Sequence, residues 1–62
     1  MNDEPLYEIW GCYTDDEYID PVFLEDVYSL KEAVITLKEY RTKRDFAAWI
    51  LNKETGKIIK DV

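Results

Sequence analysis

Residues 29–40 read SLKEAVITLKEY, which is the pattern of an amphipathic helix. Ser29 and Glu32 form a capping box: the serine hydroxyl is expected to accept the amide of Glu32, and the Glu32 carboxylate to reach back to the amide of Ser29. One apolar stripe then follows at helical spacing, made of Leu30, Ala33, Val34, Leu37 and Tyr40. Ile35 falls opposite this stripe and is expected to be exposed. The pattern predicts a helix that packs on one side only.

Three segments around this helix have the composition of β-strands, namely residues 6–14, 46–51 and 57–62. A short returning strand is also predicted over residues 18–24, although Asp20 and Pro21 interrupt it. Residues 52–56 indicate a hairpin turn, with Gly56 at the position that needs a positive φ.

These elements predict one α+β domain over residues 1–62, with a three- or four-stranded, mainly antiparallel sheet and one α-helix packed on one face, in the order β(β)αββ. The long connection between residues 15 and 43 also permits a parallel crossover, so the strand order stays open. A chain of 62 residues has room for one domain. Its apolar content of 47%, with two Trp, five Tyr and two Phe, excludes an intrinsically disordered chain.

The charges are divided unevenly along the chain. The formal net charge is −6, and the first 28 residues hold nine carboxylates and no Lys or Arg. An acidic protein repels nucleic-acid phosphates and attracts basic protein surfaces. The predicted partner is therefore a protein with a basic surface, and nucleic acid is unlikely to be bound. The candidate partner-binding residues are Asp15, Asp16, Glu17, Asp20 and Trp10.

The residue types of catalysis and metal binding are scarce. The chain has no histidine, and its one serine, Ser29, serves as the helix cap. Its one cysteine, Cys12, lies among aromatic residues and is expected to be buried and unreactive. The acidic cluster lacks the ligand spacing of a calcium loop, and both glycines are isolated. We expect no catalytic, cofactor-binding or metal site.

The two strongest strands are apolar on both faces. Tyr7, Ile9, Gly11 and Tyr13 alternate with Leu6, Glu8, Trp10 and Cys12, and a similar alternation runs along residues 46–51. Since one helix covers one face, residues 15–28 are expected to cover the second face in part; if they do not, an apolar patch is exposed there and marks an interface. Trp49 is expected to be largely buried, and Trp10 to be more exposed because it shares its face with Glu8. Gly11 in mid-strand indicates a bulge or a close approach by another element.

These patterns favour a non-catalytic protein that acts by protein–protein binding, as an inhibitor or an accessory subunit. In size and acidity the chain resembles the small acidic inhibitors that phages make against host enzymes, some of which mimic DNA. The alternative is a self-associating or small-ligand-binding module that uses an aromatic sheet face, which allows a homodimer. No apolar run reaches the ~18 residues of a membrane span, and the single cysteine and acidic N-terminus predict the cytoplasm.

Overall fold

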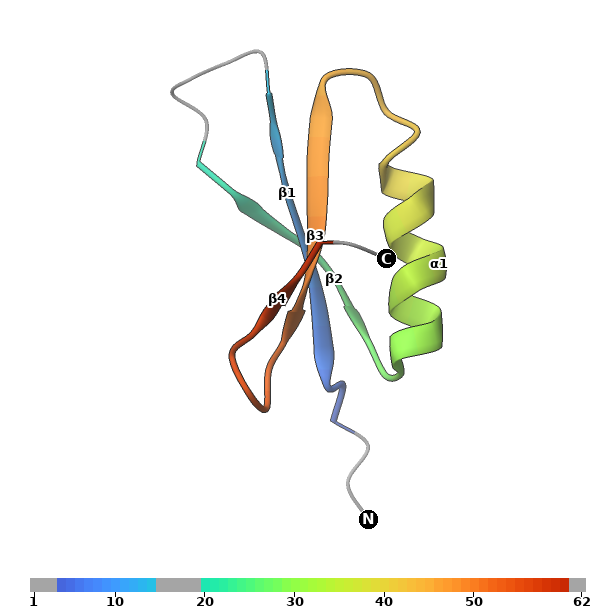
Figure 1. The fold of residues 1–62 in the computed structure, drawn as a ribbon, viewed down its shortest axis with the longest axis vertical. Helices are drawn as coiled ribbons and strands as arrows, with labels where there is room; N and C mark the ends of the chain where they lie inside the picture. The colour runs from blue at the N-terminus through green and yellow to red at the C-terminus, as the bar shows by residue number, and fades with distance from the viewer. Residues whose placement is uncertain (1–3, 15–19, 61–62) are drawn as a thin grey trace.

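The computed structural model describes residues 4–14 and 20–60. These residues form four strands and one helix, in the order β1 (Tyr7–Tyr13), β2 (Val22–Val27), α1 (Leu30–Tyr40), β3 (Phe46–Asn52) and β4 (Ile58–Ile59). The strands make one antiparallel sheet, and α1 lies along one side of it (Figure 1). The predicted α+β class and element order are confirmed.

The strand order, which the sequence left open, is β2-β1-β3-β4. β1 pairs with both β2 and β3, and both pairings are antiparallel. β2 and β3 therefore run in the same direction on either side of β1, and α1 makes the connection between them. The long crossover does exist, but it joins two strands that are separated by a third, so the described strands contain no parallel pair.

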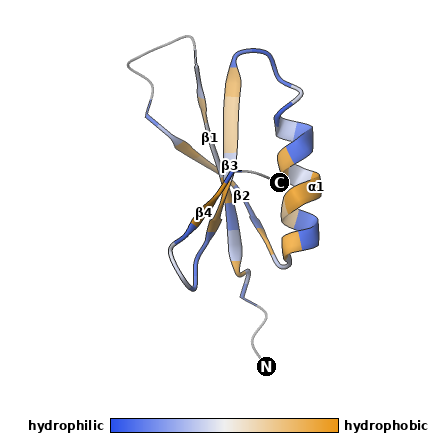
Figure 2. Ribbon diagram, in the orientation of Figure 1, coloured by the Kyte–Doolittle hydropathy of each residue, from blue (hydrophilic) through white to orange (hydrophobic). Residues whose placement is uncertain are grey.

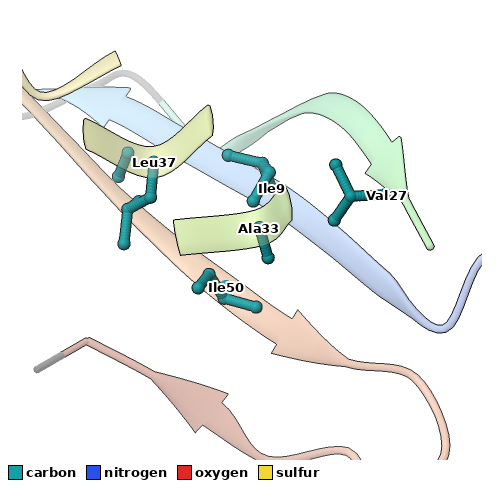
Figure 3. Close-up of a cluster of buried hydrophobic side chains, with 6 residues drawn as sticks. Ile9, Val27, Ala33, Leu37 and Ile50 are labelled. Carbon is teal, nitrogen blue, oxygen red and sulfur yellow. The ribbon is translucent and has the colours of Figure 1, made fainter. Parts of the chain in front are cut away.

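The hydrophobic core lies between α1 and the sheet. Figure 3 shows Ala33 and Leu37 of α1 facing Ile9 of β1 and Ile50 of β3. The full set of buried apolar residues is Ile9, Val27, Ala33, Leu37, Ala48 and Ile50. Only the two isoleucines and Leu37 are large side chains with no exposed surface, among the residues that the structure describes. The fully buried part of the described core is therefore small.

The helix begins at the predicted cap. The Ser29 hydroxyl accepts the amide of Glu32 at 3.2 Å, as a capping serine does. The Glu32 carboxylate accepts the amide of Tyr28 at 3.3 Å, whereas the amide of Ser29 was the predicted donor. Most of the predicted stripe faces the sheet, although Leu30 at its N-terminal end is 43% exposed. Ile35 is exposed, as expected.

Two strand boundaries differ from the prediction. β2 begins after Pro21 and continues to Val27, later than the predicted residues 18–24, because a proline has no amide to give to a strand ladder. β4 is short: it pairs only with Ile50 and Leu51. Beyond it, the Arg41 guanidinium donates to the carbonyl of Lys60, which ties this segment to the end of α1.

The β3–β4 turn forms as predicted. Gly56 has a φ of 74°, and the side-chain oxygen of Asn52 accepts the amides of Glu54 and Thr55 at 2.9 and 3.3 Å. Figure 2 shows the hydrophilic colouring gathered in this turn and in the connection between α1 and β3. Polar residues thus close the ends of the strands, and apolar residues occupy the sheet between them.

Candidate functional site

The best candidate for a functional surface is the side of the sheet that faces away from α1, here called the open face. Strand alternation and the pairing register place on it Phe23 and Asp26 of β2, Glu8, Trp10 and Cys12 of β1, Ala47, Trp49 and Leu51 of β3, and Ile58 of β4. α1 is the one described helix, and it covers the opposite face. None of the described elements packs over the open face.

This arrangement corrects the expectation that residues 15–28 cover the second face. The described part of that segment, residues 20–28, forms the edge strand β2 and its flanks, in the plane of the sheet beside β1. Backbone pairing with β1 holds these residues there, so their apolar side chains extend the sheet instead of covering it. Residues 15–19 lie outside the described part of the chain.

An aromatic row crosses the open face. Trp10 is the register partner of Phe23 on one side and of Trp49 on the other. The rings of Trp10 and Phe23 meet edge to face, with their centroids 5.9 Å apart. At the far end, the ammonium of Lys60 lies 5.8 Å from the centroid of the Trp49 ring, in cation–π contact. The row Phe23, Trp10, Trp49 and Lys60 therefore runs across the whole width of the sheet.

Glu8 fixes the orientation of the central indole. The indole nitrogen of Trp10 donates to the Glu8 carboxylate at 2.9 Å, so the ring is held by a hydrogen bond as well as by Phe23. Trp10 and Trp49 are both half-buried, so each keeps part of its ring open to solvent. They lie side by side on one face as register partners. Phe23 and Ile58 are more open, at 47% and 54% exposed.

The charged groups of the open face neutralise one another. Glu8 and Asp26 are register partners, an arrangement of like charges that destabilises a sheet unless it is compensated. The ammonium of Lys53 lies 3.8 Å from the Glu8 carboxylate and 3.7 Å from that of Asp26. With Lys60 at the end of the aromatic row, two cations balance two carboxylates. The described charged residues of the open face therefore sum to zero, in a chain whose net charge is −6.

The predicted partner-binding residues are only partly placed. Trp10 lies at the centre of the open face, and Asp20 is exposed just before β2. Asp15, Asp16 and Glu17 lie outside the described residues. Sequence reasoning missed Lys53 and Lys60, whose roles depend on contacts between distant segments. The alternation of apolar side chains on both faces of β1 and β3 was the signal that pointed to this surface.

A further carboxylate of the acidic half contacts the helix instead of a partner surface. Glu25 of β2 accepts the hydroxyl of Tyr40 at 3.0 Å. This hydrogen bond, with some burial, raises the pKa of Tyr40 above its ordinary value. Glu8, Asp26, Glu25 and Glu32 thus all have partners within the chain, which reduces the acidic surface that remains for another protein.

A hollow opens beside the aromatic row, at the end of the sheet where β3 begins. Cys12 is one of its lining residues, and its side chain is half-buried, so the expectation that this thiol is buried is wrong. The hollow is lined by Cys12, Arg41, Phe46, Ala47, Ala48, Trp49 and Lys60. It is more open than enclosed, so it forms a solvent-accessible shelf beside the Trp49 indole.

Within residues 4–14 and 20–60, no three acidic or cysteine side chains come together as a metal site would require. The described helix, α1, is too short and too polar to cross a membrane. Comparisons of this chain with protein-family models, with curated proteins and with solved structures found no match.

Proposed function

We propose that the protein acts without catalysis, by binding a protein through the open face of its sheet, as an inhibitor or an accessory subunit. The observation that carries this proposal is the row of Phe23, Trp10 and Trp49 across a face that no described element covers. Large, rigid aromatic side chains supply much of the energy of protein interfaces. Large exposed apolar patches on proteins mark interaction sites.

The shape of the surface favours a protein over the other ligand classes. Small-molecule sites are concave and bury most of their ligand, whereas the aromatic row is spread over a sheet and the hollow beside it is more open than enclosed. Nucleic acid would meet a chain with a net charge of −6. A protein surface is broad enough to cover Phe23, the two indoles and Ile58 together.

A matched pair of substitutions tests the use of this face. Ile58 on the open face and Ile35 on the outer side of α1 are 54% and 53% exposed, so Ile58→Glu and Ile35→Glu make the same chemical change at equal exposure on opposite sides of the molecule. The immobilised wild-type chain and the Ile35→Glu variant should retain the same protein from cells, and the Ile58→Glu variant should lose it. Retention of all bound protein by Ile58→Glu, with a native circular dichroism spectrum, would contradict the proposal.

Recognition of a basic partner surface by carboxylates is the second candidate. The observation that favours it is the exposed Asp20 in a chain with a net charge of −6. A variant in which four carboxylates become amides tests this, with Asn or Gln at positions Asp15, Asp16, Glu17 and Asp20. We expect it to bind a basic partner more weakly and to change the free energy of unfolding by less than ~0.5 kcal/mol. If this variant binds its partner as tightly as wild type in low salt, recognition depends on the open face alone.

A further inference from the structure

We infer that the partner of the open face is a second copy of this chain, so that two sheets pack face to face about a twofold axis. The inference rests on the part of the proposed function that makes the open face a protein-binding surface, and it gives that surface to a second copy instead of to an inhibited or assisted protein. Three observations support it: the size of the core, the order of the side chains in the aromatic row, and the charge balance of the face.

The core of one copy uses only the helix-facing side of the described sheet. Ile9, Leu37 and Ile50 are the large side chains that α1 and the sheet bury completely, within the described residues. Domains of fewer than ~70–80 residues seldom gain enough stability from one core and often add oligomerisation. A second sheet against the open face would bury Trp10, Trp49 and their neighbours and give β1 and β3 an apolar layer on both sides.

The aromatic row is complementary to itself. It reads Phe23, Trp10, Trp49, Lys60 across the sheet, with the two indoles in the middle. A twofold axis that runs along the strands, between Trp10 and Trp49, places each Trp10 over the Trp49 of the second copy. The same axis places Lys60 over the Phe23 ring of the second copy, a cation–π pair, at both ends of the row. Aligned packing of two sheets is a standard arrangement of β-structure.

The charge balance of the face also suits a second copy. Two chains of net charge −6 repel each other at long range, but Glu8 and Asp26 on the open face are neutralised by Lys53, and Lys60 completes the balance. The described residues of the surfaces that would meet therefore carry no net charge. A strongly cationic partner gains little from such a face.

The area of the face sets the strength of the expected dimer. Four strands at a spacing of about 4.8 Å, all counted at the seven-residue length of β1 and β3, give a face of at most roughly 19 by 23 Å, because β2 has six residues and β4 two. Two such faces bury at most roughly 900 Å², below the ~1,200 Å² at which stable interfaces begin. The dimer should therefore be weak and form only at high protein concentration.

Sedimentation equilibrium of the whole chain tests the inference. From about 10 µM to about 1 mM protein, wild type and Ile35→Glu should shift from monomer to dimer, and Ile58→Glu should stay monomeric. Salt should strengthen the dimer between about 0.05 and 0.5 M NaCl, because it screens the repulsion between two acidic chains. A cationic partner would show the opposite salt dependence.

A second matched pair of substitutions tests the twofold arrangement. It remains informative even if the Ile58→Glu variant does not fold. Lys60→Gln removes the cation that lies over Phe23 of the second copy, and Lys57→Gln makes the same charge change in the β3–β4 turn. We expect Lys60→Gln to raise the dimer dissociation constant about 5-fold, and Lys57→Gln to leave it unchanged. Equal effects of the two substitutions would overturn this arrangement.

A wild-type chain that stays monomeric at about 1 mM in about 0.5 M NaCl would overturn the inference itself. That result would leave the proposed function standing if Ile58→Glu still removed a protein captured by wild type. The face would then bind a different protein. If the chain is monomeric and Ile58→Glu leaves the capture of other proteins unchanged, both the dimer inference and the proposed function are contradicted.

Discussion

Gly11 determines how closely the helix-side aromatics approach the sheet. A Cβ atom at this position would lie 2.5 Å from the ring of Phe46 and 2.9 Å from the carbonyl of Ala47, both far inside normal contact. The missing side chain lets Phe46 lie directly on β1, where its ring also contacts Tyr13, at 5.1 Å between centroids. The sequence indicated either a bulge or a close approach at Gly11, and the structure shows the close approach there. The register shift in the β1–β2 pairing falls between Ile9 and Trp10, where Leu24 of β2 is the extra residue.

Gly11→Ala should destabilise the protein by ~1–3 kcal/mol, because the added methyl group overpacks the contact with Phe46. The sign is informative, since Gly→Ala in a strand with free space is expected to stabilise. Urea unfolding measures the change. Phe46→Leu should cost less in the Gly11→Ala background than in wild type, because it removes part of the clash. Equal costs in the two backgrounds would show that the ring does not limit the space at Gly11.

At the scale of the elements, side chains attach both ends of α1. Ser29 caps its first turn, and Tyr40 in its last turn reaches Glu25 on β2. Helices of eleven residues are marginal on their own, so these contacts and the packing of Ala33 and Leu37 hold the helix in place. The N-terminal contact could be predicted from the local pattern of residues 29–32. The contact of Tyr40 with Glu25 could not, because it depends on where β2 lies.

Ser29→Ala should lower the free energy of unfolding by ~1 kcal/mol, since the amide of Glu32 loses its acceptor. Ser29→Asp supplies another good cap and should preserve stability. Urea denaturation of both variants beside wild type provides the measurement. An unchanged midpoint for Ser29→Ala would mean that the hydroxyl contributes nothing to the start of the helix.

The pairing of Tyr40 with Glu25 should make stability fall in alkali. The hydrogen bond raises the pKa of Tyr40 in the folded protein, so the folded phenol keeps its proton where the unfolded one has begun to lose it. Its stabilising effect is complete below the ordinary pKa of about 10 and is lost as the pH rises through the higher folded-state value. Urea midpoints measured from about pH 8 to pH 11 should fall more steeply for wild type than for Tyr40→Phe. Parallel curves would contradict the link.

At the scale of the whole molecule, local patterns predicted the parts better than their placement. The helix at 30–40, the strands at 7–13 and 46–52 and the turn at Gly56 follow from spacing and composition, and so did the two apolar faces of β1 and β3. The expected cover by residues 15–28 failed over its described part. An apolar strand at a sheet edge has the same composition as a segment that covers a sheet, and backbone pairing decides between them.

The sequence predicted an apolar sheet face as the candidate site, but it did not predict the charge balance of that face. Trp10 was identified, and the open face follows from strand alternation together with a single helix. This balance was not predictable, because Lys53 reaches Glu8 and Asp26 from a turn more than 25 residues away along the chain. A count of acidic residues in the first half of the sequence therefore overstates the negative charge of this surface.

The central place of β1 between β2 and β3 has a consequence for how the chain folds. The β1–β2 hairpin is local, but Ile9 meets its core neighbours Leu37 and Ile50 only when segments far along the chain return to it. Closing such loops costs entropy before any apolar contact repays it, and slows folding. During synthesis, β1 and α1 cannot complete their packing until β3, residues 46–52, has left the ribosome. We therefore expect the domain to fold late and in one step, with no stable N-terminal intermediate.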